Sequence, residues 1–125
     1  MRPNLEMNPM PSPAAETWTA TRRSPRHKVN LAIRLFAVVQ HRKYALQGRT
    51  HDLSTRGMGV YIPAELQPGL VVQVELVLPD SQISLGVDGI VRDSEGFRCG
   101  LEFHNLSPRD QQALTRYCEL LSKSD

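Results

Sequence analysis

The stretch VNLAIRLFAVV, residues 29–39, decides the fold, because apolar residues occupy every second position in it. Successive side chains of a β-strand point to opposite faces, so this alternation predicts a strand with one buried face. The same period returns further along the chain, and Gly48 is expected to mark a bulge or sharp bend in the second strand. The segments expected to form strands are 29–39, 44–53, 58–62, 72–78, 83–91 and 97–103.

After the last of these segments the apolar period changes to that of a helix. Ser107, Pro108 and Asp110 suit the N-cap, first and third positions of a helix. Apolar residues then recur at helical spacing, which predicts a helix over 107–122. Closely spaced strands followed by one helix predict an all-β domain, namely a six-stranded antiparallel barrel over 29–104 with the C-terminal helix covering one opening.

The composition of the chain bounds its class. Its 125 residues and 40% hydrophobic content fit one globular domain. Residues 1–20 are rich in proline and poor in large aliphatic side chains, so we expect a disordered tail there. No apolar run approaches the roughly 18 residues of a membrane helix, and no secretory signal is evident. We therefore expect no membrane insertion. Cys99 and Cys118 are too few for a disulfide framework or a zinc site, so we expect a cytoplasmic protein with reduced thiols and no metal.

The net charge of +2 hides an uneven distribution. Residues 22–56 hold nine Lys or Arg against Asp52 alone, whereas residues 57–125 hold five basic against ten acidic residues. This concentrated positive segment favours an anionic ligand. Because only two or three of its arginines fall in one short motif, a compact anion is a better match than a long polymer.

The first motif lies just before the first expected strand. It reads Arg22-Arg23-Ser24-Pro25-Arg26 and contains an Arg-x-x-x-Arg pair, with Arg23 as a secondary candidate. Pro25 disfavours helix at the residue before it, so residues 21–28 are expected to form an extended, flexible arm. Arginine presents a planar fork that matches phosphate oxygens and also pairs with guanine O6 and N7.

The second motif, Asp52-Leu-Ser54-Thr-Arg-Gly57, ends the second expected strand. In an extended run Asp52 and Ser54 point the same way. Gly57 permits a backbone conformation with positive φ and leaves room for a flat ligand to approach. A carboxylate accepts from adjacent N–H donors, which guanine N1 and N2 supply, and a serine hydroxyl adds adaptable hydrogen bonding. Together the motifs indicate a guanine nucleotide with several phosphates.

In this order and at this distance, the two motifs resemble the RxxxR and [D/N]xSxxG pair of the PilZ domain family. Residues 100–103, Gly-Leu-Glu-Phe, and the helix after them are similar to the family's last strand and helix. The resemblance covers roughly 21–122. It implies a receptor for cyclic di-GMP, a bacterial second messenger, whose arm folds over the ligand and signals to a protein partner. The residues to which it assigns ligand contacts are Arg22, Arg26, Asp52, Ser54 and Gly57, with Arg23 as an alternate.

Two other functions compete with this interpretation. The first is a protein-interaction adaptor of the same fold that works without nucleotide. The second is a nucleic-acid-binding barrel, which the low aromatic content of 6% disfavours. An enzyme is not expected. His51, Asp52 and Ser54 have the residue types of a catalytic triad, but His51 and Asp52 should point to opposite faces of a strand, and no oxyanion element is evident. The expected state is a monomer or weak dimer without cofactor.

Overall fold

The computed structural model describes residues 25–124. The predicted tail over 1–20, and Arg22 and Arg23 of the first motif, lie outside these residues. The described elements are β1 (Ala32–Val39), β2 (Arg42–Leu53), β3 (Gly57–Tyr61), β4 (Val71–Val77), β5 (Ser84–Glu95), β6 (Arg98–His104) and α2 (Pro108–Ser124).

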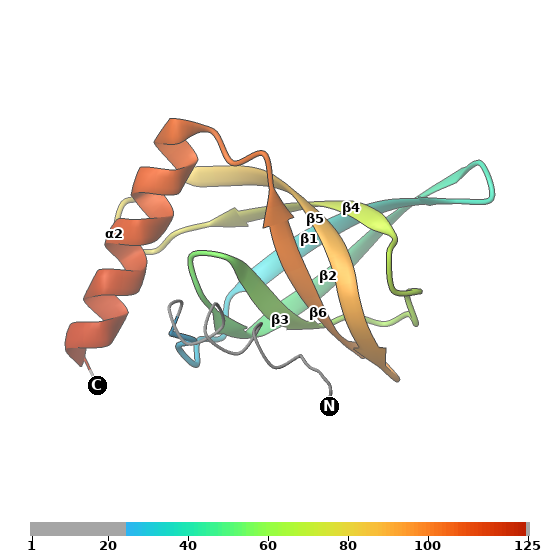
Figure 1. The fold of residues 1–125 in the computed structure, drawn as a ribbon, viewed down its shortest axis with the longest axis horizontal. Coiled ribbons are helices and arrows are strands. Elements are labelled where there is room, and N and C mark those ends of the chain that lie inside the picture. Colours follow the sequence, from blue (N-terminus) through green and yellow to red (C-terminus); the bar gives the residue numbers. More distant parts are fainter. Residues whose placement is uncertain (1–24, 125) are drawn as a thin grey trace, which may run out of the picture.

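The six strands close into one antiparallel barrel in the order β1-β2-β3-β6-β5-β4. The last pairing, between β1 and β4, joins the two ends of the sheet and leaves no long open edge. Figure 1 shows α2 lying at one end of the barrel, while the β1–β2 hairpin projects at the other. The fold is therefore the six-stranded barrel with a C-terminal helix that the sequence predicts.

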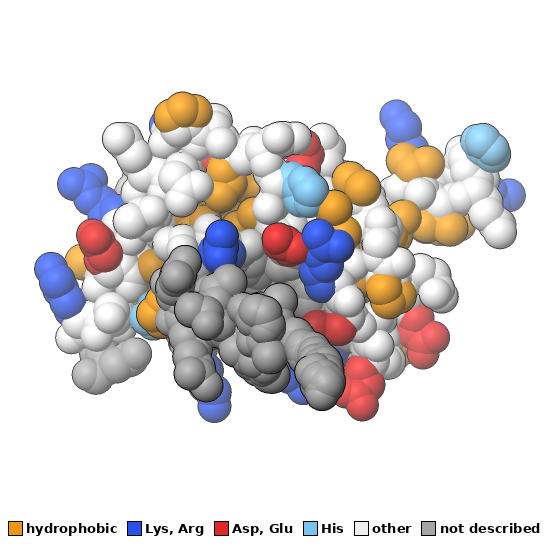
Figure 2. All heavy atoms as spheres, in the orientation of Figure 1, with side chains coloured by type: hydrophobic (Ala, Val, Ile, Leu, Met, Phe, Trp, Pro, Cys, Tyr) orange, Lys and Arg blue, Asp and Glu red, His pale blue; other side chains and the backbone are white. Residues whose placement is uncertain are grey.

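The projecting hairpin turns through Gln40 and His41, whose φ angles are 51° and 66°. Figure 2 shows basic side chains at its tip and hydrophobic ones along it. Val38 of β1 and Tyr44 of β2 are among the exposed large apolar residues. Because this hairpin lies at the opposite end of β2 from Leu53, its basic tip supplies remote controls for experiments on the second motif.

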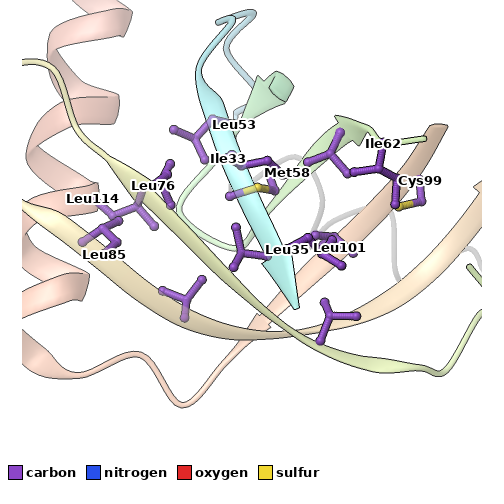
Figure 3. Packing of buried hydrophobic residues seen from close by; sticks show 14 of the residues in the cluster. Ile33, Leu35, Leu53, Met58, Ile62, Leu76, Leu85, Cys99, Leu101 and Leu114 are labelled. Carbon is purple, nitrogen blue, oxygen red and sulfur yellow. The ribbon is translucent and has the colours of Figure 1, made fainter. Parts of the chain in front are cut away.

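Alternating side chains of the strands fill the barrel interior. In β1, Ile33, Leu35 and Ala37 are buried, as their period-two spacing predicts. Figure 3 shows Leu114 of α2 close to Leu76 at the end of the barrel, so the helix closes the core. The buried apolar residues are Ile33, Leu35, Ala37, Leu53, Met58, Val60, Ile62, Leu66, Val72, Val74, Leu76, Leu78, Leu85, Val87, Val91, Cys99, Leu101, Ala113, Leu114, Tyr117 and Cys118.

The start of α2 follows its sequence signature. Ser107 Oγ accepts from the amide of Asp110 over 3.1 Å, and Pro108 is the first helical residue. This side-chain cap satisfies one of the backbone donors that a helix start leaves unpaired. The apolar stripe of the helix continues to Leu121, which packs against the core. The helix therefore contacts the end of the barrel along most of its length.

The irregularity of β2 is not where Gly48 suggests. The register shifts between Thr50 and Asp52, so the bulge is three residues later than expected. A side chain on Gly48 would collide with the carbonyl of Tyr61 and with Ile62. Gly48 is therefore required for the close approach of neighbouring backbone, the other common reason for glycine within a strand.

Candidate functional site

The described end of the arm is fixed to the barrel by a short backbone bridge. The amide of His27 donates to the carbonyl of Leu53, and the amide of Leu53 donates back to the carbonyl of His27, both over 2.9 Å. This bridge joins the first motif to the end of β2, where the second motif begins. It places Arg26 beside Asp52.

The bulge in β2 determines which way Asp52 points. Thr50 and Leu53 are both buried, with exposed fractions of 2% and 0%. Two inward residues three positions apart break strict alternation, and the extra residue of the bulge makes this possible. His51 and Asp52 consequently both lie outside the core, on the same side of the strand. The expectation that they point apart is wrong, because it assumed a regular strand.

The Asp52 carboxylate accepts two hydrogen bonds, and an imidazole nitrogen lies beside its other oxygen. Arg26 Nη1 donates to Oδ1 over 2.8 Å, and the amide of Gly59 donates to the same oxygen over 3.0 Å. His51 Nδ1 lies 2.8 Å from Oδ2. An ionised carboxylate offers about four lone-pair positions, so it retains capacity to accept from a ligand.

The ion pair between Arg26 and Asp52 is open on the arginine side. The Arg26 side chain is 50% exposed, whereas that of Asp52 is 18% exposed. Solvent screens such a pair, and exposed ion pairs contribute at most about 1 kcal/mol to stability. The arginine is therefore free to exchange its partner at small energetic cost, while the carboxylate stays anchored to the barrel.

Four residues around Asp52 lie outside the two motifs, namely His51, Gly59, Tyr61 and Arg98. Arg98 donates to His51 Nε2 over 3.3 Å, and the ring of Tyr61 lies 5.0 Å from that of His51. A side chain on Gly59 would collide with the His51 imidazole. Gly59 is the β3 partner of Asp52, so the absence of a side chain there makes room for the ring beside the carboxylate.

Ser54 is buried and stabilises the loop that follows β2. Its residue is 2% exposed, and its hydroxyl accepts from the amides of Arg56 and Gly57 over 3.1 and 3.2 Å. The backbone of Ser54 also donates to the carbonyl of Gly57 over 2.9 Å. The expectation that it shares the exposed face of Asp52 is not met, because β2 ends at Leu53 and the chain turns. Its hydroxyl closes the loop between β2 and β3.

Gly57 meets a steric requirement different from the expected one. The glycines with positive φ in the described residues are Gly69 and Gly96, so Gly57 does not use the positive φ that a glycine permits. A side chain on Gly57 would collide with the carbonyl oxygen of Leu101 in β6. The glycine thus permits close pairing of β3 with β6 directly below the motif, and the space beside it is filled by backbone.

Among residues 25–124, no cluster of His, Cys, Asp and Glu has the arrangement of a metal site. Within the same residues, no helix has the length and apolar content to span a membrane. Burial raises the pKa of both thiols, those of Cys99 and Cys118, to about 11, with Asp93 adding to the effect at Cys99. The thiolate, which is the nucleophilic form, is therefore a small fraction of each at neutral pH.

Residues 20–120 match the family model of the PilZ domain. The chain belongs to the PilZ domain family. The match spans both motifs, the barrel and most of α2. A search of curated proteins finds no match to this PilZ domain.

Solved structures share this fold at low sequence identity. The PilZ domain of CeSA from a cellulose-synthesizing bacterium is 20% identical, with a TM-score of 0.61 over 79% of this chain and 99% of that one. The PilZ domain of YcgR from Escherichia coli, solved with c-di-GMP, is 22% identical, with a TM-score of 0.63 over 82% and 92%. The inhibitor of motility MotI/DgrA of Bacillus subtilis is 20% identical, with a TM-score of 0.67 over 83% and 52%, so this chain spans about half of that protein.

Proposed function

We propose that this PilZ domain is a receptor for cyclic di-GMP (c-di-GMP) that changes conformation when the ligand binds. The observation that carries the proposal is the 2.8 Å contact of Arg26 with Asp52, which joins the end of the arginine motif to the start of the aspartate motif. The contact brings together two residues that are 26 positions apart in the sequence. Membership of the PilZ family and the likeness to a PilZ domain solved with c-di-GMP support the choice of ligand.

The chemistry of the two side chains suits the two parts of this ligand. The Asp52 carboxylate accepts N–H donors, and guanine presents N1–H and N2–H side by side. The Arg26 guanidinium matches phosphate oxygens or stacks on a base. In the proposed sequence of events Arg26 leaves Asp52, a guanine edge takes its place, and the guanidinium binds the ligand. One ion pair is exchanged for several charge-assisted hydrogen bonds.

The other motif residues have different parts in the proposal. Arg22, with Arg23 as an alternate, would add phosphate contacts from the arm. Ser54 and Gly57 would act mainly by holding the β2–β3 loop, since the hydroxyl of Ser54 already bonds backbone amides. Ordering the arm over the ligand is the conformational change that would carry the signal.

Three finer expectations belong to the same proposal. The liganded form would regulate a protein partner, in a process such as motility or biofilm formation. The domain would act by binding, without catalysis, and would do so in the cytoplasm. The likeness of its fold to the Bacillus subtilis inhibitor of motility is compatible with such a role.

A panel of anions tests the choice of ligand. Thermal unfolding is followed with c-di-GMP, cyclic di-AMP, GTP and a generic single-stranded oligonucleotide, because a ligand that binds only the folded state raises Tm. We expect a concentration-dependent rise with c-di-GMP and little with the others. In Figure 2, basic and acidic side chains are interspersed on the visible face, which argues against a continuous basic surface for a nucleic acid there. An equal, salt-sensitive rise with the oligonucleotide would replace the proposal with nucleic-acid binding.

A further inference from the structure

We propose that His51 is a positioning residue that fixes the Asp52 carboxylate for ligand recognition. The inference rests on the proposed function, because its readout is ligand affinity. His51 is the residue immediately before the aspartate motif, and the bulge of β2 turns its ring to the same side as the carboxylate. A regular strand would point the two side chains in opposite directions.

The contacts of the imidazole select one form of the ring. Arg98 donates from Nε to Nε2 of His51 over 3.3 Å, and a guanidinium has no acceptor, so Nε2 must be unprotonated. Nδ1, 2.8 Å from Asp52 Oδ2, must then carry the proton, since an ionised carboxylate only accepts. The neutral Nδ1–H tautomer satisfies both neighbours. Arg98 thereby fixes the direction in which His51 donates.

The ring has little freedom to leave this position. It lies over Gly59, where any side chain would collide with it, and beside the ring of Tyr61 at 5.0 Å. Its side chain is 20% exposed. Packing on β3 and the hydrogen bond from β6 thus hold the donor in place from two further strands.

The consequence appears when Arg26 exchanges Asp52 for a ligand. Asp52 then loses the Arg26 contact but keeps the Gly59 amide on Oδ1 and His51 Nδ1 at 2.8 Å from Oδ2. With both oxygens still held, the carboxylate does not have to be ordered at the moment of binding. Preorganisation of this kind increases affinity by lowering the entropic cost of association.

The test uses variants that separate the donor from the ring. His51→Phe keeps a ring above Gly59 but removes both nitrogens, whereas His51→Asn keeps an N–H donor near the position of Nδ1. We expect calorimetric titration to show about tenfold weaker c-di-GMP binding for His51→Phe, the size of one charged hydrogen bond. Asn should recover most of this loss. His41→Asn, at the hairpin tip where φ is 66°, is the control and should bind as the wild type does.

A double-mutant cycle distinguishes positioning from general structural support. If His51 acts through Asp52, His51→Phe should cause almost no further loss of c-di-GMP affinity in a protein that already carries Asp52→Ala. A full tenfold loss in that background would overturn the inference, as would wild-type affinity in His51→Phe. Failure of the proposed function has a different signature, namely a wild-type protein that gives no saturable binding of c-di-GMP at all.

Discussion

Arg26 and Asp52 are joined by a 2.8 Å hydrogen bond between the guanidinium and the carboxylate, across 26 residues of sequence. The backbone bridge between His27 and Leu53 makes this contact possible, because it aligns the arm with the end of β2. The arginine is half exposed and the carboxylate is largely covered. The pair therefore consists of one exchangeable partner and one fixed partner, as the proposed exchange of Arg26 for a ligand requires.

Removing the exchangeable partner should weaken ligand binding without unfolding the barrel. For Arg26→Ala we expect c-di-GMP affinity to fall by about 1–3 kcal/mol, the range for hydrogen bonds to charged groups. Unfolding by urea should change by less than about 1 kcal/mol, because the ion pair is exposed. Arg42→Ala, which removes the same charge at the far end of β2, is the control and should leave both quantities near the wild type. Equal losses of c-di-GMP affinity in the two variants would show that the net charge of the protein matters and that Arg26 is not part of a specific site.

Removing the fixed partner should change specificity as well as affinity. A carboxylate accepts from guanine N1 and N2, whereas an amide offers one acceptor and one donor and tolerates an adenine edge better. Asp52→Asn should therefore lose affinity for c-di-GMP and also part of its preference over cyclic di-AMP. Titration of both nucleotides into wild type and Asp52→Asn measures the ratio. An unchanged preference in the variant would show that Asp52 does not contact the base.

Gly57 tests whether the motif glycine is required by the barrel. In Gly57→Ala the added Cβ meets the carbonyl oxygen of Leu101, and neither backbone can yield easily. We expect a loss of about 1–3 kcal/mol, typical of overpacking, and hence a fall in Tm of at least about 4 °C. Gly86→Ala is the matched control, because no atom lies within 4 Å of its added Cβ. Thermal unfolding of the two variants should separate them clearly, and similar Tm values would contradict the steric account.

The two cysteines should be inert in the folded protein. Burial raises the pKa of Cys99 and Cys118 from 9.0 to about 11, so the thiolate fraction at pH 8 is small. Iodoacetamide at pH 8 should modify the native protein much more slowly than the urea-unfolded protein, as mass spectrometry would show. Since the folded pKa is raised, the stability linked to these thiols is present below pH 9 and declines as pH rises towards 11. Rapid native labelling at pH 8 would show that the thiols are accessible.

The predictability of the fold and of the site differ for a physical reason. Period-two spacing in β1 and the Ser107 cap follow from local chemistry, and both were visible in the sequence. The bulge at His51 depends on how β2 pairs with β3, a non-local relationship that no local pattern encodes. Its effect was decisive for the site, because it turned His51 towards Asp52. The same holds for Gly57, whose requirement comes from Leu101 in a strand more than forty residues later.

The most direct test of the central claim is calorimetric titration of c-di-GMP into the wild-type chain and into Arg26→Ala side by side. The account predicts saturable heat for the wild type at micromolar concentrations and about a tenfold or greater loss of affinity in the variant. Wild-type heat that does not saturate at tens of micromolar, or an identical isotherm in Arg26→Ala, would contradict it.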